Sequence, residues 1–384
     1  MTSDTRAKGA RKTLLYVANV AWFFRSHRMP LALEAVRRGY DVHLATAFGN
    51  AQEREDFERD GIETHHVPFE RSGTGVAREA AAILRLRQLY IRLRPALSHN
   101  VSIKPVIYGG LLSRLYGIPC VQAISGLGYN YVAGGFRARL RRSVLSLAYS
   151  SAVASARSRV IVQNEDDWTF FRRELGVDEH RLVMIKGSGV DLRAFDPGIP
   201  SDTPPLVVLL ARMLADKGVR EFAAAARLVK ERGVVAKFAL VGGLDPDNRA
   251  GLMQHEIEEI TRDGALEYWG HRSDVAQVLE AARIVCLPSY REGFPKSLLE
   301  AAAAGRAIVA TDVPGCREIV RHGENGLLVP PRDPQALADA LAHLIPDAQL
   351  CAAMGQRGRA LVEQYFSLDI VVSRTMQLYA DMLR

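Results

Sequence analysis

The chain has 384 residues, of which 48% are hydrophobic and 24% are charged, a composition that excludes a disordered or fibrous protein and leaves room for about two domains. It contains no apolar run long enough for a membrane span, and the basic segment 1–12 is not followed by the apolar stretch of a secretory signal, so we expect a cytoplasmic protein. The four cysteines lie far apart without metal-ligand spacing, which argues against a disulfide framework and a structural zinc site.

Positive charge is concentrated in the first half of the chain. The formal net charge is +7, yet no acidic residue occurs between Glu79 and Glu165, a stretch that holds twelve lysines and arginines. An asymmetry this local predicts a polyanionic partner for the first half.

Short apolar runs alternate with helical stretches along the whole chain. The predicted strands cover residues 14–18, 42–46, 160–163, 206–210, 238–241, 284–288 and 308–310. Apolar strands separated by helices are typical of parallel sheets covered on both faces, so we predict an α/β fold of two Rossmann-like, doubly wound domains facing a central cleft.

The domain boundaries follow from composition. We predict a flexible basic tail at 1–12, an N-terminal domain at 13–195, a proline-rich linker at 196–205, a C-terminal domain at 206–365, and a final amphipathic helix at 366–384 that packs back on the N-terminal domain. Because ligands of open α/β sheets bind beyond the carboxyl ends of the strands, chemistry is expected in the loops that follow them.

In the N-terminal domain, the segment after the first strand lacks the G-x-G-x-x-G pattern, which argues against a dinucleotide dehydrogenase. His27 follows that strand and could serve the cleft as an acid, base or hydrogen-bond donor, although a lone histidine near a helix start is more often structural. The same two interpretations apply to Lys104 and to the turn that contains Ser125 and Gly126.

Residues 136–149 combine arginines with apolar side chains at helical spacing. Such a helix can insert its apolar face into lipid while cations contact anionic headgroups. The alternative is an ordinary amphipathic helix packed on the sheet with a solvated basic edge. We favour the membrane interpretation, with these residues facing the membrane: Arg137, Arg139, Arg141 and Arg142.

In the C-terminal domain, Arg212 and Lys217 follow the strand 206–210 and precede a helix. Two cations at a strand-to-helix turn can converge on one anion and so form a diphosphate clamp, the alternative being two solvated surface cations. The glycines Gly243 and Gly270 also follow predicted strands and allow close approach of a base or phosphate.

The strand 284–288 runs into a loop with Glu292, Gly293 and Phe294, and a helix is expected to start at Pro295 and to carry Glu300. Free N–H groups at a helix start attract anions, and two carboxylates spaced E-x7-E can accept hydrogen bonds from sugar hydroxyls. The arrangement suits a sugar nucleotide, unless both acids are only solvated helix charges. The Asp245-Pro-Asp247 loop is interpreted as a loop and not as a metal site.

Together these motifs resemble the retaining GT-B glycosyltransferases of family 4 over essentially the whole chain. The likeness rests on motifs in the family's order: Arg212 to Gly218, Glu292 to Ala301, Gly305, Gly315 to Glu318, and 323–329. Segments 27–28, 103–110 and 125–129 look like the bacterial subgroup that extends polyprenyl-diphosphate-linked oligosaccharides.

The resemblance implies a role for each matched residue. Arg212 and Lys217 would bind the donor diphosphate, Glu292 the donor-sugar hydroxyls and Glu300 the ribose, while Gly293 and Phe294 would offer backbone N–H groups. Two positions depart from the family pattern: Ser125 stands where many members have a histidine, and residues 19–24 stand where many have a Gly-Gly phosphate loop.

We therefore expect a retaining transferase that moves a hexose or N-acetylhexosamine from a nucleotide sugar, UDP-linked in our prediction, to a polyprenyl-diphosphate-linked acceptor. It would work at the inner face of the cell membrane, with no metal, cofactor or nucleic acid. The alternatives are a sugar-nucleotide epimerase of the same fold, a transferase for a soluble acceptor, and a non-catalytic nucleotide-sugar-binding subunit.

Overall fold

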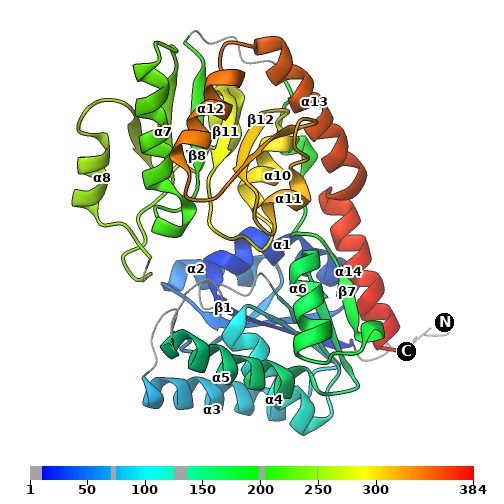
Figure 1. Ribbon diagram of the computed structural model, residues 1–384. Helices are drawn as coiled ribbons and strands as arrows, with labels where there is room; N and C mark the ends of the chain where they lie inside the picture. The colour runs from blue at the N-terminus through cyan, green and yellow to red at the C-terminus, as the bar shows by residue number, and fades with distance from the viewer. Residues whose placement is uncertain (1–10, 71–74, 125–135, 199–203, 249) are drawn as a thin grey trace, which may run out of the picture.

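The computed structural model describes residues 11–70, 75–124, 136–198, 204–248 and 250–384. Two α/β domains lie one above the other, and the last helix, α14 (Leu368–Met382), runs down the side of the first domain (Figure 1). The two doubly wound domains predicted from the sequence are thereby confirmed.

The first domain is built on a parallel seven-stranded sheet of order β3-β2-β1-β4-β5-β6-β7. Its strands are β1 (Thr13–Val20), β2 (Asp41–Ala47), β3 (Glu63–His66), β4 (Leu97–Val101), β5 (Cys120–Ala123), β6 (Ser158–Val162) and β7 (Leu182–Met184). Its helices are α1 (Ala21–Arg37), α2 (Ala51–Arg59), α3 (Val76–Leu93), α4 (Ile103–Tyr116), α5 (Phe136–Val153) and α6 (Glu165–Thr169).

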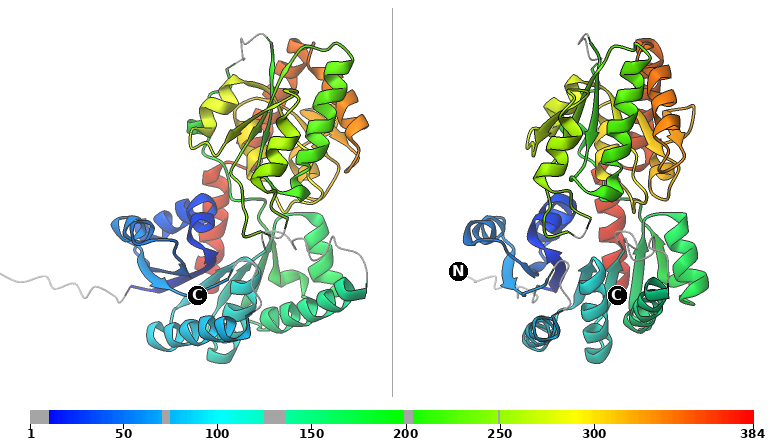
Figure 2. Two further views of the ribbon diagram at one scale, coloured as in Figure 1. Left: turned by 90° about the vertical axis from the view of Figure 1, so that its left-hand side faces the viewer. Right: turned by 60° about the vertical axis from the view of Figure 1, so that its left-hand side comes forward.

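The central strand β1 is covered on both faces, because alternate side chains enter two different hydrophobic clusters. Tyr16 packs with Phe24 of α1 and Tyr379 of α14, whereas Leu15 packs with Leu86 of α3. Helices α3, α4 and α5 thus lie on the face of the sheet that is turned away from the second domain (Figure 2).

The second domain repeats the plan with a parallel six-stranded sheet of order β10-β9-β8-β11-β12-β13. Its strands are β8 (Leu206–Leu210), β9 (Lys237–Val241), β10 (Glu267–Gly270), β11 (Ala282–Leu287), β12 (Ala307–Thr311) and β13 (Gly326–Val329). Its helices are α7 (Val219–Glu231), α8 (Gln254–Thr261), α9 (Val275–Ala281), α10 (Lys296–Ala303), α11 (Cys316–Ile319), α12 (Pro334–Leu344) and α13 (Ala348–Tyr365).

Two segments cross between the domains and are tied to each other. The Val190 N–H donates to the Phe366 carbonyl at 3.2 Å, and the Leu368 N–H donates to the Val190 carbonyl at 2.9 Å. Gly189 has a φ of +77°, and a Cβ there would lie 2.7 Å from the Leu368 Cα, so this close crossing requires glycine. Of the predicted linker 196–205, residues 199–203 lie outside the described part of the chain.

The final helix packs against α1 of the first domain, with Tyr379 fully buried. None of the helices in the described parts of the chain combines the length and hydropathy that crossing a membrane requires.

Candidate active site

The carboxyl ends of the two sheets face each other across the domain interface. The Arg212 guanidinium, after β8, lies 5.4 Å from the ring centre of Trp22, which follows β1. Asn164, after β6, donates from Nδ2 to the Gly293 carbonyl at 2.9 Å. The loops where the sequence places the candidate residues therefore meet at one interface, as expected for ligand sites of open α/β sheets.

The turn between β8 and α7 positions Arg212 and Lys217. It closes on Gly218, which has a φ of +73° and lies so close to the Pro288 carbonyl that a Cβ would collide with it. Arg212 forms an ion pair with Asp245, and Lys217 forms one with Glu292. Arg212 thus pairs with the loop after β9 and Lys217 with the loop after β11, and the convergence of both cations on one anion stays a prediction.

Glu292 is held in place from two sides. The Ser289 hydroxyl donates to its Oε1 at 2.6 Å, and Lys217 donates to the same oxygen. The Glu292 side chain is only 10% exposed. A carboxylate fixed in this way is preorganised, since little side-chain entropy remains to be lost when a ligand binds.

Phe294 has a packing role. Its ring is buried in the second-domain core and meets Phe366 edge-to-face, with the ring centres 5.2 Å apart. Its side chain thus holds the loop against the crossing segment, and only its backbone is left for the role predicted from the resemblance.

The helix α10 follows this loop and begins at Lys296, one residue later than predicted, with Pro295 just before it. Glu300 pairs with Lys296 at 3.2 Å, and burial raises the pKa of the Glu300 carboxyl above its usual value although the Lys296 charge opposes this. The first turn of α10 leaves N–H groups that favour a negative charge.

The predicted glycines Gly243 and Gly270 connect neighbouring strand ends of the second domain. The Gly243 carbonyl accepts from the Met213 N–H at 3.0 Å, and the Gly270 carbonyl accepts from the Gly242 N–H at 2.8 Å. These bonds bring the ends of β8, β9 and β10 together.

His27 lies in α1 at the same interface. Its ring stacks on Phe23, with the ring centres 4.2 Å apart, and its Nδ1 lies 3.2 Å from the Phe23 carbonyl. Burial, aided by the charges of Arg28, Lys296 and Arg212, lowers the pKa of His27 from 6.5 to about 3. The imidazole is therefore neutral at pH 7, with Nδ1–H donating to the backbone and Nε2 left as an acceptor, which disfavours the expected acid or donor role.

The other candidates of the first domain are not brought to this interface by any described contact. Lys104 forms an ion pair with Glu79 and donates to the Glu70 carbonyl at 2.6 Å, which neutralises its charge. Ser125 and Gly126 lie outside the described residues. The same holds for the side chains of the four arginines of α5, Arg137, Arg139, Arg141 and Arg142, whose backbone is helical.

One group in the described residues has the composition of a metal site, namely His43, Glu63 and His65 at the sheet edge on β2 and β3. His43 Nε2 lies 3.0 Å from Asp41, His43 Nδ1 lies 2.9 Å from His65 Nε2, and Arg92 donates to His65 Nδ1. This chain of hydrogen bonds uses the lone pairs that a metal would need, and it does not reach the interface residues.

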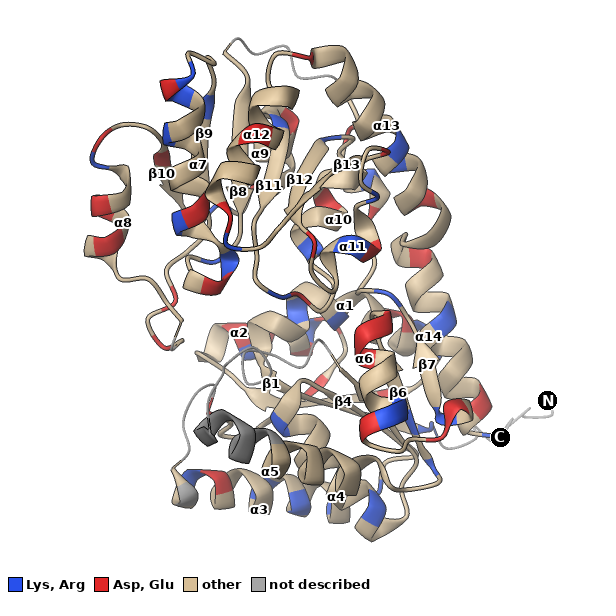
Figure 3. Ribbon diagram, viewed as in Figure 1, with Lys and Arg blue, Asp and Glu red and all other residues tan. Residues whose placement is uncertain are grey.

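Several residues of the interface were not predicted from the sequence as site residues. Trp22, Asn164 and Ser289 are single polar or aromatic residues just after strands, and only their position after a strand could have marked them. Asp245, which the sequence places in a loop, forms an ion pair with Arg212. Lysine, arginine, aspartate and glutamate positions occur on the segments of both domains that face each other (Figure 3).

Comparison with known proteins places this architecture in a family. The signature of "Glycosyl transferase 4-like" proteins matches residues 13–164, and that of "Glycosyl transferases group 1" matches residues 204–347. The chain is 32% identical over 291 residues to the N,N'-diacetylbacillosaminyl-diphospho-undecaprenol alpha-1,3-N-acetylgalactosaminyltransferase of Campylobacter jejuni, covering 72% of this chain and 74% of the relative.

A second relative and a solved structure agree. The UDP-Gal:alpha-D-GlcNAc-diphosphoundecaprenol alpha-1,3-galactosyltransferase of Escherichia coli is 25% identical, with 85% of this chain and 86% of the relative covered. The Anabaena protein HepE, solved in complex with UDP and glucose, superposes with a TM-score of 0.76 at 20% identity, covering 96% of this chain and all of that structure. The chain therefore belongs to the GT-B glycosyltransferases of family 4 and is a glycosyltransferase.

Proposed function

We propose that this glycosyltransferase moves a hexose or N-acetylhexosamine from a UDP-sugar to a saccharide carried on polyprenyl diphosphate, with retention at the anomeric carbon, in the assembly of a bacterial surface polysaccharide or glycan. The observation that carries the proposal is the grouping of Arg212, Lys217, Glu292 and the start of α10 at one interface, in a chain whose relatives act on undecaprenyl-diphosphate-linked sugars.

The donor is assigned to the second domain. The relative from Escherichia coli is named for a UDP-linked donor, and the Anabaena structure holds UDP. In this chain, two cations and the N-terminus of α10 follow strands β8 and β11, where a diphosphate would be neutralised. Glu300, one turn into α10, would accept hydrogen bonds from the ribose.

The chemical step would break the bond between the sugar and the diphosphate, and negative charge would build on the departing oxygen. Arg212, Lys217 and the α10 N–H groups would stabilise that charge, each preorganised donor contributing about 3–4 kcal/mol. To engage the diphosphate, Lys217 would share its charge between phosphate and Glu292, its partner in the structure. In the proposed front-face mechanism, the departing phosphate takes the acceptor proton.

This mechanism needs no residue that shuttles a proton. His27 has a pKa of about 3, which makes it a weak base, and its Nε2 would instead accept a hydrogen bond from a substrate hydroxyl. No metal is required, because Arg212, Lys217 and the helix N-terminus supply the positive charge.

Membrane attachment is proposed through the outer face of α3, α4 and α5. Large hydrophobic side chains are exposed on all three helices, and Leu84, Leu115 and Leu147 are 57%, 68% and 70% exposed. Exposed arginines alternate with them, among them Arg85 and Arg114. Apolar residues that insert into lipid, next to cations that contact anionic headgroups, are typical of peripheral membrane proteins. The predicted basic helix, α5, is one of the three.

The transfer is tested by mass spectrometry of a short polyprenyl-diphosphate saccharide incubated with the protein and a mixture of UDP- and GDP-sugars. A hexose or N-acetylhexosamine mass added to the lipid supports the proposal and identifies the donor. Lys217→Met is expected to lower the rate by about 10²–10³-fold, because one preorganised donor is lost. Lys230→Met is the matched control, since Lys230 lies near the last residue of α7, at the opposite end of that helix from Lys217, and donates to the Gly264 carbonyl.

Two results would contradict the proposal. A sugar nucleotide that is isomerised regardless of lipid would indicate an epimerase. Transfer to a free saccharide but not to the lipid-linked one would indicate a soluble acceptor.

Membrane binding has its own test with vesicles of neutral and anionic lipid. The double variant Leu84→Glu/Leu115→Glu is expected to lose co-sedimentation with anionic vesicles. Val235→Glu is the control, because Val235 is at least as exposed, at 71%, but lies on the second domain. Equal loss in both variants would refute the assignment of the α3–α5 face.

A further inference from the structure

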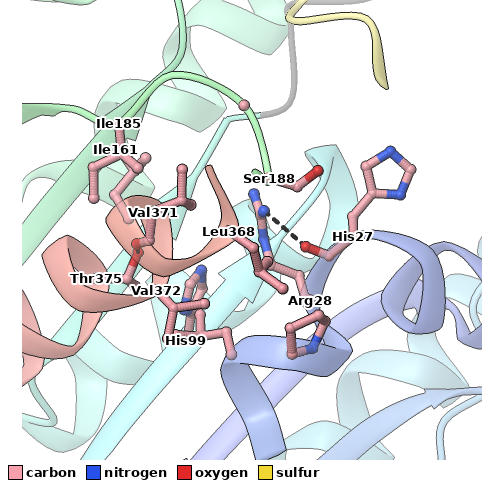
Figure 4. A pocket seen from close by; sticks show the side chains of 13 residues that line it. His27, Arg28, His99, Ile161, Ile185, Ser188, Leu368, Val371, Val372 and Thr375 are labelled. Carbon is pink, nitrogen blue, oxygen red and sulfur yellow. Dashed lines mark hydrogen bonds between the residues drawn. The ribbon is translucent and has the colours of Figure 1, made fainter. Parts of the chain in front are cut away.

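A pocket lies beside the two crossings between the domains. It is formed by α1, β4, the segment after β7 and the first turns of α14 (Figure 4). In this view the Arg28 guanidinium points toward Ser188, whereas the His27 ring turns away from the other lining side chains. The lining residues that matter here are Arg28, His99, Ser188 and Leu368.

Arg28 is a buried cation without a carboxylate. Arg28 is only 7% exposed, and its Nη1 donates to the His27 carbonyl at 3.1 Å. Its Nε has no hydrogen-bond partner among the described residues. The nearby phenols Tyr16 and Tyr379 carry no compensating charge, because burial raises the pKa of both, and no acidic residue lines the pocket within the described chain. A buried charge left in this state is costly, so its environment calls for a counter-anion.

His99 adds a second unsatisfied group to the same pocket. Its Nδ1 contacts the Tyr379 hydroxyl, and that hydroxyl donates to Tyr16 at 3.3 Å. The Nδ1 is therefore the donor toward Tyr379, which leaves Nε2 as a lone-pair acceptor. This Nε2 is buried and also without a hydrogen-bond partner in the described chain. The residues that line the pocket thus include a buried cationic donor and a buried neutral acceptor.

We propose that this pocket binds a hydrogen phosphate group. Its anionic oxygens would be held by Arg28, and its P–OH proton would be donated to His99 Nε2. Because Ser188 and Leu368 belong to the two crossing segments, a bound phosphate would join α1 to both crossings and stabilise the relative position of the domains. The site is separate from the donor cations Arg212 and Lys217, neither of which lines the pocket.

The proposal is tested on the full-length protein by thermal unfolding during titration with inorganic phosphate, at ionic strength held constant with KCl. Phosphate is expected to raise Tm in the wild type and in Lys217→Met, because ligands that bind the folded state stabilise it. Arg28→Met is expected to abolish the shift, and Arg28→Lys to reduce it. A shift that is lost in Lys217→Met but kept in Arg28→Met would place the phosphate at the donor site and overturn the proposal.

A second measurement covers the case in which Arg28→Met does not fold. Wild-type crystals soaked in arsenate, a protonated phosphate analogue, are expected to show an anomalous peak within hydrogen-bond distance of Arg28 Nε. Absence of that peak at a concentration that saturates the thermal shift would overturn the site. A short-chain prenyl diphosphate, titrated in parallel, distinguishes the sources: if it shifts Tm through Arg28 at lower concentration than phosphate, the group belongs to a lipid, and otherwise to free phosphate.

Discussion

The low pKa of His27 predicts a loss of stability in acid that a single substitution removes. The folded pKa is about 3 and the ordinary value is 6.5. Because the folded pKa is lower, the unfolded chain binds the proton at a higher pH than the folded protein does. The contribution of neutral His27 is therefore fully present above pH 6.5, and it is lost as the pH falls from 6.5 toward the folded value of about 3.

The magnitude follows from the same shift. At about 1.4 kcal/mol per pKa unit, lowering the pH from about 8 to about 5 costs about 2 kcal/mol through this residue. His27→Leu removes the titrating group, and the lost stacking on Phe23 adds an offset that does not vary with pH. His65 and His99 also have lowered pKa values, but they are present in both proteins.

The assay is urea unfolding of both proteins across this pH range, followed by circular dichroism. The free energy of unfolding of the wild type is expected to fall more steeply in acid than that of His27→Leu. Between about pH 8 and about pH 5, the wild type should lose about 2 kcal/mol more than the variant. Parallel curves would refute the reasoning, because they would show that His27 is not shielded from protons by the domain interface.

Three further predictions concern the second domain. Gly218→Ala forces a residue with a side chain into a left-handed conformation against the Pro288 carbonyl, so we expect a loss of more than about 1–2 kcal/mol in urea unfolding and weaker UDP binding by calorimetry; unchanged values would refute the tight turn. Glu300→Gln is expected to raise Tm at neutral pH but not near pH 4, because the folded pKa of Glu300 is raised and its charge therefore opposes folding as the pH rises; activity should fall in the same variant. Prolonged dialysis against EDTA is expected to leave the transfer rate unchanged, and restoration of a lost rate by a divalent cation would contradict the metal-independent mechanism.

Some strands could be predicted from the sequence and others could not, for a physical reason. All seven predicted strands are present, with β6 and β11 ending one residue earlier than expected, since continuous apolar runs mark strands buried on both faces. The strand β4 was missed because its central residues Ser98, His99 and Asn100 are polar. They can be buried because other elements supply their hydrogen-bond partners. The Tyr90 hydroxyl bonds Ser98 at 2.6 Å, and the hydroxyl of Tyr379, 280 residues further along the chain, bonds His99.

The sequence by itself determined the two α/β domains and the loops that carry Arg212, Lys217, Glu292 and Glu300, because apolar periodicity and motif spacing are local properties of the chain. It could not give the partner of each residue. Asp245 neutralises Arg212, and Asn164 of the first domain holds the Gly293 carbonyl. Only the tertiary structure decided these contacts, and likewise the burial of Arg28 and His27, because charge pairing and desolvation depend on which distant segments packing brings together.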